Sequence, residues 1–77
     1  MISERNKYKE KFLKLLGANV KKVRENKGLS QFKLSIEADI PKNQVGRIER
    51  GEINTSIFTL KRIADALQVE VIEFLQK

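Results

Sequence analysis

The segment from Gln31 to Arg50 constrains the fold of this chain more than any other, because it carries two helical patterns separated by a single break. Leu34 and Ala38 are four residues apart, a spacing that places both on one face of a helix. Val45 and Ile48 are three residues apart and share the face of another helix. The segment therefore predicts two short helices that meet at a corner.

The break between the two patterns holds residues that suit a turn. Asp39 tolerates a left-handed backbone better than most residues that have a side chain. Pro41 fits the first turn of a helix, where no backbone N–H is needed. Ile40 is expected to fill the corner, and the small Ser35 allows two helices to cross closely. These features together are typical of a helix-turn-helix.

This segment and its flanks resemble the lambda Cro and repressor type of helix-turn-helix, a family often called XRE. The phrases LSQ, RIERGEIN and TLKRIADAL, which follow one another in this order, carry the resemblance. It covers about four-fifths of the chain, from roughly Leu16 to Leu75. It implies an all-α, five-helix, lambda-repressor-like DNA-binding domain over residues 16–77, with residues 1–15 as an N-terminal extension of the first helix.

The composition limits the classes of function that the chain can support. A chain of 77 residues forms one domain with a small core, which favours pairing with a second copy. It contains no Cys and no His, so thiolate metal sites and the commonest general base are lacking. We therefore expect no enzyme activity, no cofactor and no metal, and no small-molecule effector is evident.

The sequence also bears on the location of the protein. No apolar run approaches the length of about 18 residues that a membrane span requires, and the first four residues do not resemble a signal peptide. The expectation is a cytoplasmic protein that does not contact membranes.

Positive charge is concentrated at the amino end. The formal net charge is +6, and residues 1–27 carry nine Lys or Arg against three Asp or Glu. A basic patch favours polyanions, of which nucleic acid is the usual one. A basic helix that is merely solvated is the alternative.

The first helix is predicted to be long. No Pro occurs between Glu4 and Lys27, and apolar residues recur at spacings of four and three. The helix is expected to be ordered from about Lys7 and to end before Gly28. Three apolar residues of the extension could cover the edge of the core, contact a partner subunit or fray. These are Tyr8, Phe12 and Leu15.

Four further helices are expected. The second begins after the cap Ser30, and its residues Phe32 and Ile36 form an additional apolar stripe. This stripe is expected to pack on the first helix, with a partner site as the alternative.

The third helix covers Lys42 to Arg50 and contains Gly46, which is either a point of close backbone approach or a harmless surface glycine. The fourth follows Thr55 or Ser56 as cap and faces inward with Ile57, Leu60, Ile63, Ala64 and Leu67, and the fifth covers Val69 to Leu75.

The polar positions of the third helix suit the recognition of duplex DNA. Lys and Arg can bind guanine O6 and N7, and Asn can pair with adenine N6 and N7. The resemblance implies base contacts at Lys42, Asn43, Gln44 and Arg47, and phosphate contacts at Gln31, Arg50 and Asn54. For each of these residues the alternative is an ordinary solvated side chain.

Two further pairs of residues have expected structural roles. The resemblance implies that Arg24 and Glu49 form a salt bridge between the first and third helices, the alternative being two surface charges. Phe58 and Ile72 lie beyond the inward faces of the last two helices and are expected at a homodimer interface, unless they complete the core. A two-fold dimer places its third helices about 34 Å apart, one turn of DNA.

The sequence thus predicts a transcriptional regulator specific for a double-stranded DNA sequence. It is expected to bind an inverted-repeat operator as a homodimer, through the major groove. The alternative is a protein-binding module, such as an antitoxin-like or scaffold helix-turn-helix protein. Phage-type repressor, restriction–modification controller and antitoxin remain open as subclasses, as does the choice between repression and activation.

Overall fold

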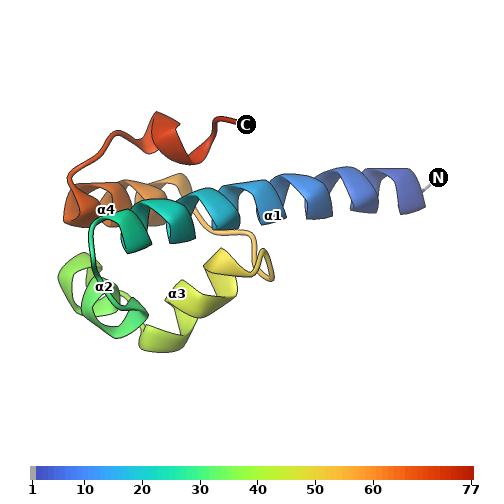
Figure 1. The fold of residues 1–77 in the computed structure, drawn as a ribbon. Coiled ribbons are helices and arrows are strands. Elements are labelled where there is room, and N and C mark those ends of the chain that lie inside the picture. Colours follow the sequence, from blue (N-terminus) through green and yellow to red (C-terminus); the bar gives the residue numbers. More distant parts are fainter. Residues whose placement is uncertain (1) are drawn as a thin grey trace.

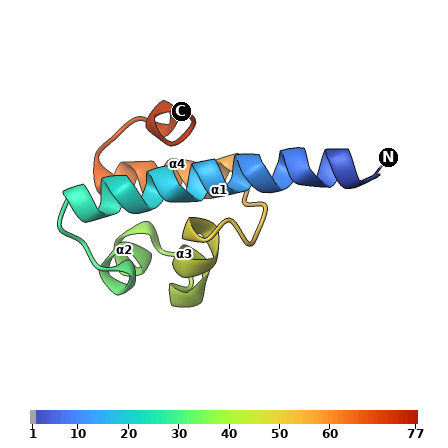
Figure 2. The same ribbon diagram turned by 45° about the vertical axis from the view of Figure 1, so that its right-hand side comes forward.

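The computed structural model describes residues 2–77, and all regular elements in this range are helical (Figure 1). Four α-helices are followed by one turn of 3₁₀ helix. Their bounds are α1 Ile2–Asn26, α2 Gln31–Ala38, α3 Lys42–Glu49, α4 Ile57–Leu67 and η1 Val71–Phe74. Figures 1 and 2 show α2 and α3 on one side of α1, with the C-terminal segment on the other. None of the described helices has the length and apolarity needed to cross a membrane.

The core forms where the four α-helices and η1 meet, and it confirms most of the predicted inward faces. Val45 and Ile48 of α3 are buried, as are Leu34, Ser35 and Ala38 of α2. The fully buried Phe74, which the periodicity did not reveal, closes the core from η1. The buried apolar residues are Leu16, Val20, Leu34, Ala38, Val45, Ile48, Leu60, Ile63, Ala64, Leu67 and Phe74.

The prediction of five α-helices is wrong at the last element. Residues Val71–Phe74 form a 3₁₀ helix, in which the N–H of Leu75 donates to the carbonyl of Ile72. The side-chain amide of Asn19 on α1 donates to the carbonyls of Phe74, at 2.9 Å, and Gln76, at 2.6 Å. These bonds and the burial of Phe74 hold the segment against α1. A single turn of 3₁₀ helix provides its local backbone hydrogen bond.

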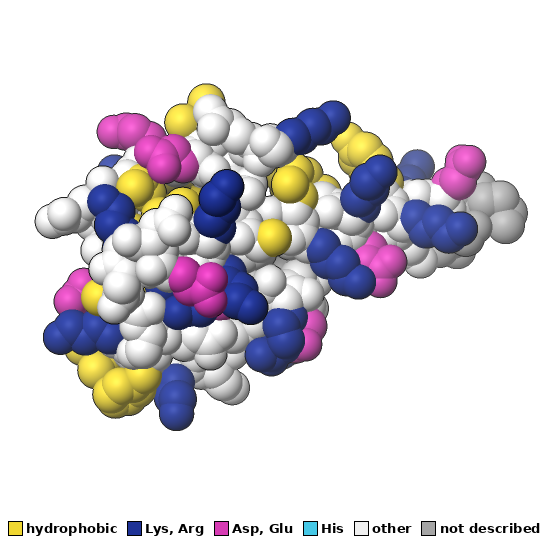
Figure 3. Space-filling view, viewed as in Figure 1, with side chains coloured by type: hydrophobic (Ala, Val, Ile, Leu, Met, Phe, Trp, Pro, Cys, Tyr) yellow, Lys and Arg dark blue, Asp and Glu magenta, His cyan; other side chains and the backbone are white. Residues whose placement is uncertain are grey.

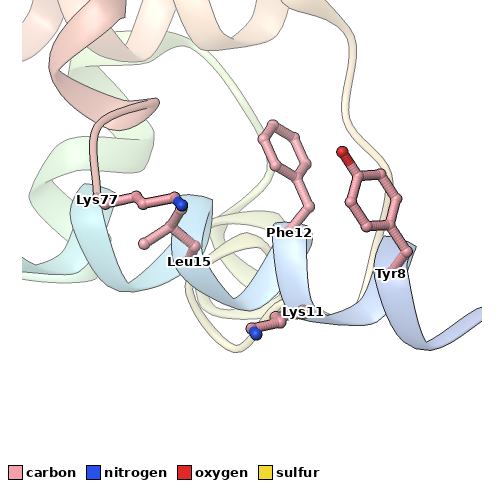
Figure 4. Close-up of a pocket in the computed structure, with 5 residues that line it drawn as sticks. All are labelled: Tyr8, Lys11, Phe12, Leu15 and Lys77. Atoms are coloured by element: carbon pink, nitrogen blue, oxygen red, sulfur yellow. The ribbon is translucent and has the colours of Figure 1, made fainter.

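Helix α1 begins at Ile2, earlier than the expected ordered start near Lys7. The segment contains no helix-breaking Pro, and the helix protrudes well beyond the other elements (Figures 1 and 2). Tyr8 is 79% exposed and Phe12 46% exposed, so neither covers the core. With Lys11, Leu15 and Lys77 they line an open groove on the side of α1 that faces the C-terminus (Figure 4).

Helices α1 and α3 approach each other closely at Gly17. A Cβ atom at this position would lie 2.5 Å from the carbonyl oxygen of Glu49, and it would also collide with the carbonyl oxygen of Ile48. No side chain fits there without moving the backbone of one helix. The absence of a side chain at Gly17 therefore sets the distance between the long helix and the carboxyl end of α3.

Two predicted inward faces differ from the structure. Phe32 and Ile36 do not pack on α1, since they are 54% and 58% exposed. Their spacing places them together on one face of α2, but the opposite face, with Leu34 and Ala38, is the one that is buried. Ile57 is 68% exposed because it lies in the first turn of α4, at the margin of the helix's inward face.

Candidate nucleic-acid interface

The turn between α2 and α3 fixes the direction of α3. The hydroxyl of Ser30 caps α2 by accepting from the N–H of Lys33 at 3.0 Å, as predicted. Asp39 ends the helix in the left-handed region with φ of 57°. Arg62 of α4 holds this residue through its carboxylate, at 3.0 Å, and through its backbone carbonyl. Pro41 occupies the position just before α3 begins.

Helix α3 buries one face and presents the other to solvent. Lys42, Asn43 and Arg47 are exposed, whereas Gln44 is half-buried. The four residues predicted to contact bases therefore lie on one short helix, and three of them have exposed side chains. These three carry the donors and acceptors that base edges in the major groove require.

A largely buried network joins the carboxyl end of α3 to α1 and to the start of α2. Arg24 donates to Glu49 through Nε–Oε2 at 2.6 Å and Nη2–Oε1 at 3.1 Å, and through Nη1 to the carbonyl of Leu29 at 2.8 Å. The hydrogen bond from Arg24 to Glu49 raises the pKa of the guanidinium above its usual value. Gln31 donates to the same carboxylate at 2.9 Å. Glu49 thus orients a predicted phosphate-contacting amide at the start of α2.

The absence of a side chain at Gly46 leaves space for the side chains of Arg50 and Gln31 on the surface of α3. A Cβ atom there would lie 2.9 Å from Nη1 of Arg50 and 3.5 Å from Oε1 of Gln31. Both neighbours are predicted phosphate contacts. One comes from the start of α2 and the other from the residue that follows α3, and they converge over this glycine. Gly46 is buried beneath them, so the interpretation as a harmless surface glycine is wrong.

A carboxylate lies among the arginines of this face. Glu52 accepts from Arg50 at 2.6 Å, and it lies 3.8 Å from Nε of Arg47. The hydrogen bond from Arg50 lowers the pKa of Glu52 and in turn raises the pKa of Arg50. Glu52 is not among the predicted site residues. Its position two residues after Arg50, and five after Arg47, is the signal that could have indicated this contact.

An aromatic contact at the amino end of α3 was also missed. Nζ of Lys42 lies 5.6 Å from the centroid of the Phe32 ring, within the range of a cation–π interaction. The ring is exposed, and Figure 3 shows hydrophobic side chains gathered on the surface over α2, with Lys or Arg side chains nearby. Periodicity could not have indicated this pair, because its members belong to different helices.

The remaining predicted site residues lie apart from this face or at its margin. Asn54 is exposed in the loop between α3 and α4, and among the described residues no side-chain hydrogen bond joins it to the other predicted contacts. Phe58 is 65% exposed and Ile72 60% exposed, so neither completes the core. Arg62 covers one face of the Phe58 ring, at 5.6 Å from its centroid.

Comparison with known proteins gives a consistent assignment. The family model HTH_3, described as helix-turn-helix, matches residues 20–74. Control protein C.BamHI of Bacillus amyloliquefaciens is 37% identical over 57 residues, which are 73% of this chain and 70% of that protein. The HTH-type transcriptional regulator y4dJ of Sinorhizobium fredii is 33% identical over 60 residues, which are 78% of each.

Solved structures show the same fold. The crystal structure of the restriction-modification controller protein C.AhdI from Aeromonas hydrophila superposes with a TM-score of 0.79 and 34% sequence identity. The superposition covers 80% of this chain and 90% of that one. The chain therefore belongs to the helix-turn-helix transcriptional regulator family, of the XRE type, whose members bind double-stranded DNA.

Proposed function

We propose that the protein regulates transcription by binding an inverted-repeat operator as a homodimer, with α3 of each copy in the major groove. Residues 16–77 form the DNA-binding domain in this proposal, and residues 1–15 extend its first helix. The observation that carries the proposal is the exposed face of α3, where Lys42, Asn43 and Arg47 stand beside Gln31 and Arg50.

The face combines the two kinds of contact that sequence-specific binding needs. Lys42, Asn43, Gln44 and Arg47 are assigned to base edges, where cationic and amide groups discriminate between base pairs. Three other residues, Gln31, Arg50 and Asn54, are assigned to phosphates, which fix the position of the domain on the duplex. Because three of these seven side chains are cations, affinity is expected to fall as salt concentration rises.

A homodimer would double the contacts and set the spacing of the half-sites. Phe58 and Ile72 are exposed apolar side chains outside the α3 face, and their burial between two copies would supply the driving force for pairing. A two-fold arrangement that spaces the α3 helices one DNA turn apart, about 34 Å, would read an inverted repeat.

Selection of bound duplexes from a random DNA library tests the proposal. The wild type is expected to enrich an inverted repeat with half-sites about one turn apart. Arg47→Ala should relax the preference at one position of each half-site, whereas Lys61→Ala, an exposed cation on α4, should leave the sequence unchanged. The selections are run at two salt concentrations.

Salt-sensitive binding without an enriched sequence would contradict the proposal. That result would leave a basic surface without sequence readout, and it would favour the alternative function of a protein-binding module. The protein would then be examined for a partner that covers its exposed apolar residues.

A further inference from the structure

We propose that Phe32 determines part of the DNA specificity, by contacting the methyl group of a thymine next to the guanine that Lys42 binds. This inference rests on the proposed function, and it assigns one component of the sequence that the operator must contain. It concerns a residue of α2, outside the helix to which base recognition is assigned above.

The position of the Phe32 ring is the first observation. Phe32 is the second residue of α2, and Lys42 is the first residue of α3. The lysine Nζ lies 5.6 Å from the ring centroid, so the ring stands beside the end of α3 that enters the groove in the proposed complex. The surface of Phe32 is therefore continuous with the proposed base-reading face.

The exposure of this ring requires an explanation. The side chain is 54% accessible although burial of an aromatic ring is strongly favourable, and the core of the domain is already complete without it. The cation of Lys42 lies over the ring, so the occupant of this surface is expected to be anionic. Duplex DNA fits that charge and reaches the adjacent face.

The chemistry of the major groove narrows the choice of base. Among the four bases, only thymine presents an apolar group there, the C5 methyl, and a phenyl ring is a suitable partner for it. Lysine binds guanine through O6 and N7. The Lys42 Nζ lies 5.6 Å from the ring centroid, less than two base-pair steps of about 3.4 Å, so both contacts fall on neighbouring base pairs.

The test compares thymine with uracil in the selected operator, since the two bases differ in this methyl group alone. Wild type should bind about two- to five-fold more weakly when deoxyuridine replaces the thymine next to the guanine that Lys42 contacts. This fold-change corresponds to the burial of one methyl group. Lys42→Ala identifies that guanine by relaxing the preference for it. Phe32→Ala should bind the two duplexes equally.

Two further variants separate the contributions. Phe32→Leu keeps an apolar contact and should retain a preference for thymine, but it loses the cation–π interaction with Lys42. Ile36→Ala is the matched control, because Ile36 is equally exposed on the same helix, one turn further along. It should keep the thymine preference of the wild type. Thermal melts verify that each variant is folded.

The inference is overturned if Phe32→Ala retains the wild-type ratio of affinities for thymine and uracil, or if no thymine neighbours the guanine in the enriched sequence. In both cases an operator has been enriched, so the proposed function stands. Failure to enrich any sequence would overturn the proposed function and this inference together.

Discussion

Arg24 and Glu49 join the long helix α1 to the end of α3 through a two-pronged ion pair, with Nε–Oε2 at 2.6 Å and Nη2–Oε1 at 3.1 Å. The side chains are only 9% and 2% exposed, and the third guanidinium nitrogen, Nη1 of Arg24, donates to the carbonyl of Leu29. A charged pair this well satisfied tolerates burial, whereas either partner alone does not.

Removing the carboxylate should therefore destabilise the domain strongly. Glu49→Ala leaves the Arg24 guanidinium buried without its counter-charge, and we expect a loss of about 3–5 kcal/mol in the free energy of unfolding. Thermal or urea denaturation measures it. Glu25→Ala is the control, because Glu25 is exposed and lies 3.9 Å from Arg24; its effect should stay below about 1 kcal/mol. Equal stabilities for the two variants would contradict the role assigned to Glu49.

Gly46→Ala should separate stability from DNA binding. Alanine favours the helix by about 0.5–1 kcal/mol, but its Cβ would lie 2.9 Å from Nη1 of Arg50 and displace that side chain. The melting temperature should therefore stay the same or rise. Affinity for the operator should fall about two- to ten-fold, which corresponds to the loss of one hydrogen bond. In an Arg50→Ala background the same substitution should have no further effect on affinity. A full additional loss in that background would show that Gly46 acts independently of Arg50.

Glu52→Gln should strengthen binding to DNA of unrelated sequence. Glu52 holds Arg50 at 2.6 Å and lies 3.8 Å from Arg47, so its neutralisation frees cationic charge for phosphates. Affinity for a random duplex should rise about two- to five-fold. The slope of log affinity against log salt concentration should become steeper by the amount expected for about one additional phosphate contact. Asp65→Asn, which breaks the exposed pair of Asp65 with Lys61 on α4, serves as control and should change neither quantity. An unaltered salt dependence for Glu52→Gln would exclude this role for the carboxylate.

The same carboxylate gives a pH dependence with a defined sign. The hydrogen bond from Arg50 lowers the pKa of Glu52 in the folded protein below its ordinary value of 4.5. The folded state is therefore stabilised at pH values above that ordinary value, and the contribution disappears as pH falls through the lowered pKa. The difference in melting temperature between wild type and Glu52→Gln should be present at pH 7, and it should disappear at pH values below the lowered pKa of Glu52. A difference in melting temperature that grows as the pH falls would contradict this role of Glu52.

Phe58→Ser should weaken pairing of two copies. If the exposed ring of Phe58 is buried between protomers, its removal should raise the dissociation constant of the dimer at least about ten-fold. Sedimentation equilibrium at tens of micromolar measures this. Lys33→Ala shortens an exposed side chain on α2, outside the proposed interface of Phe58 and Ile72, and should leave pairing unchanged. A wild type that sediments as a monomer would rule out a dimer in free solution, although not pairing on DNA.

The sequence predicted those features of the fold that depend on local chemistry. Spacing of apolar residues identified the buried faces of α2 and α3, and the cap at Ser30 and the left-handed turn at Asp39 follow from the properties of single residues. Local patterns say which residues share a face, but they do not say what covers it. For that reason the stripe of Phe32 and Ile36 was placed on α1, although it is exposed.

Features that depend on contacts between elements could not be predicted in this way. The short 3₁₀ turn at Val71–Phe74 depends on Asn19, which is more than fifty residues away in the sequence. The crowding of Arg50 and Gln31 over Gly46, and the ion pairs of Glu52, depend on how side chains from neighbouring segments converge. At the site, the sequence supplied the candidate DNA contacts, whereas the residues that orient them emerge from the packing.

The close contact at Gly17 divides α1 into two parts that differ in their tolerance of insertions and deletions. Gaining or losing one residue before Leu13 turns the protruding end by about 100° and leaves the contact with α3 in place. The same change between Gly17 and Arg24 would rotate the guanidinium away from Glu49 and displace α3. Over evolutionary time the protruding end can vary in length, whereas the segment from Gly17 to Arg24 must keep its eight residues.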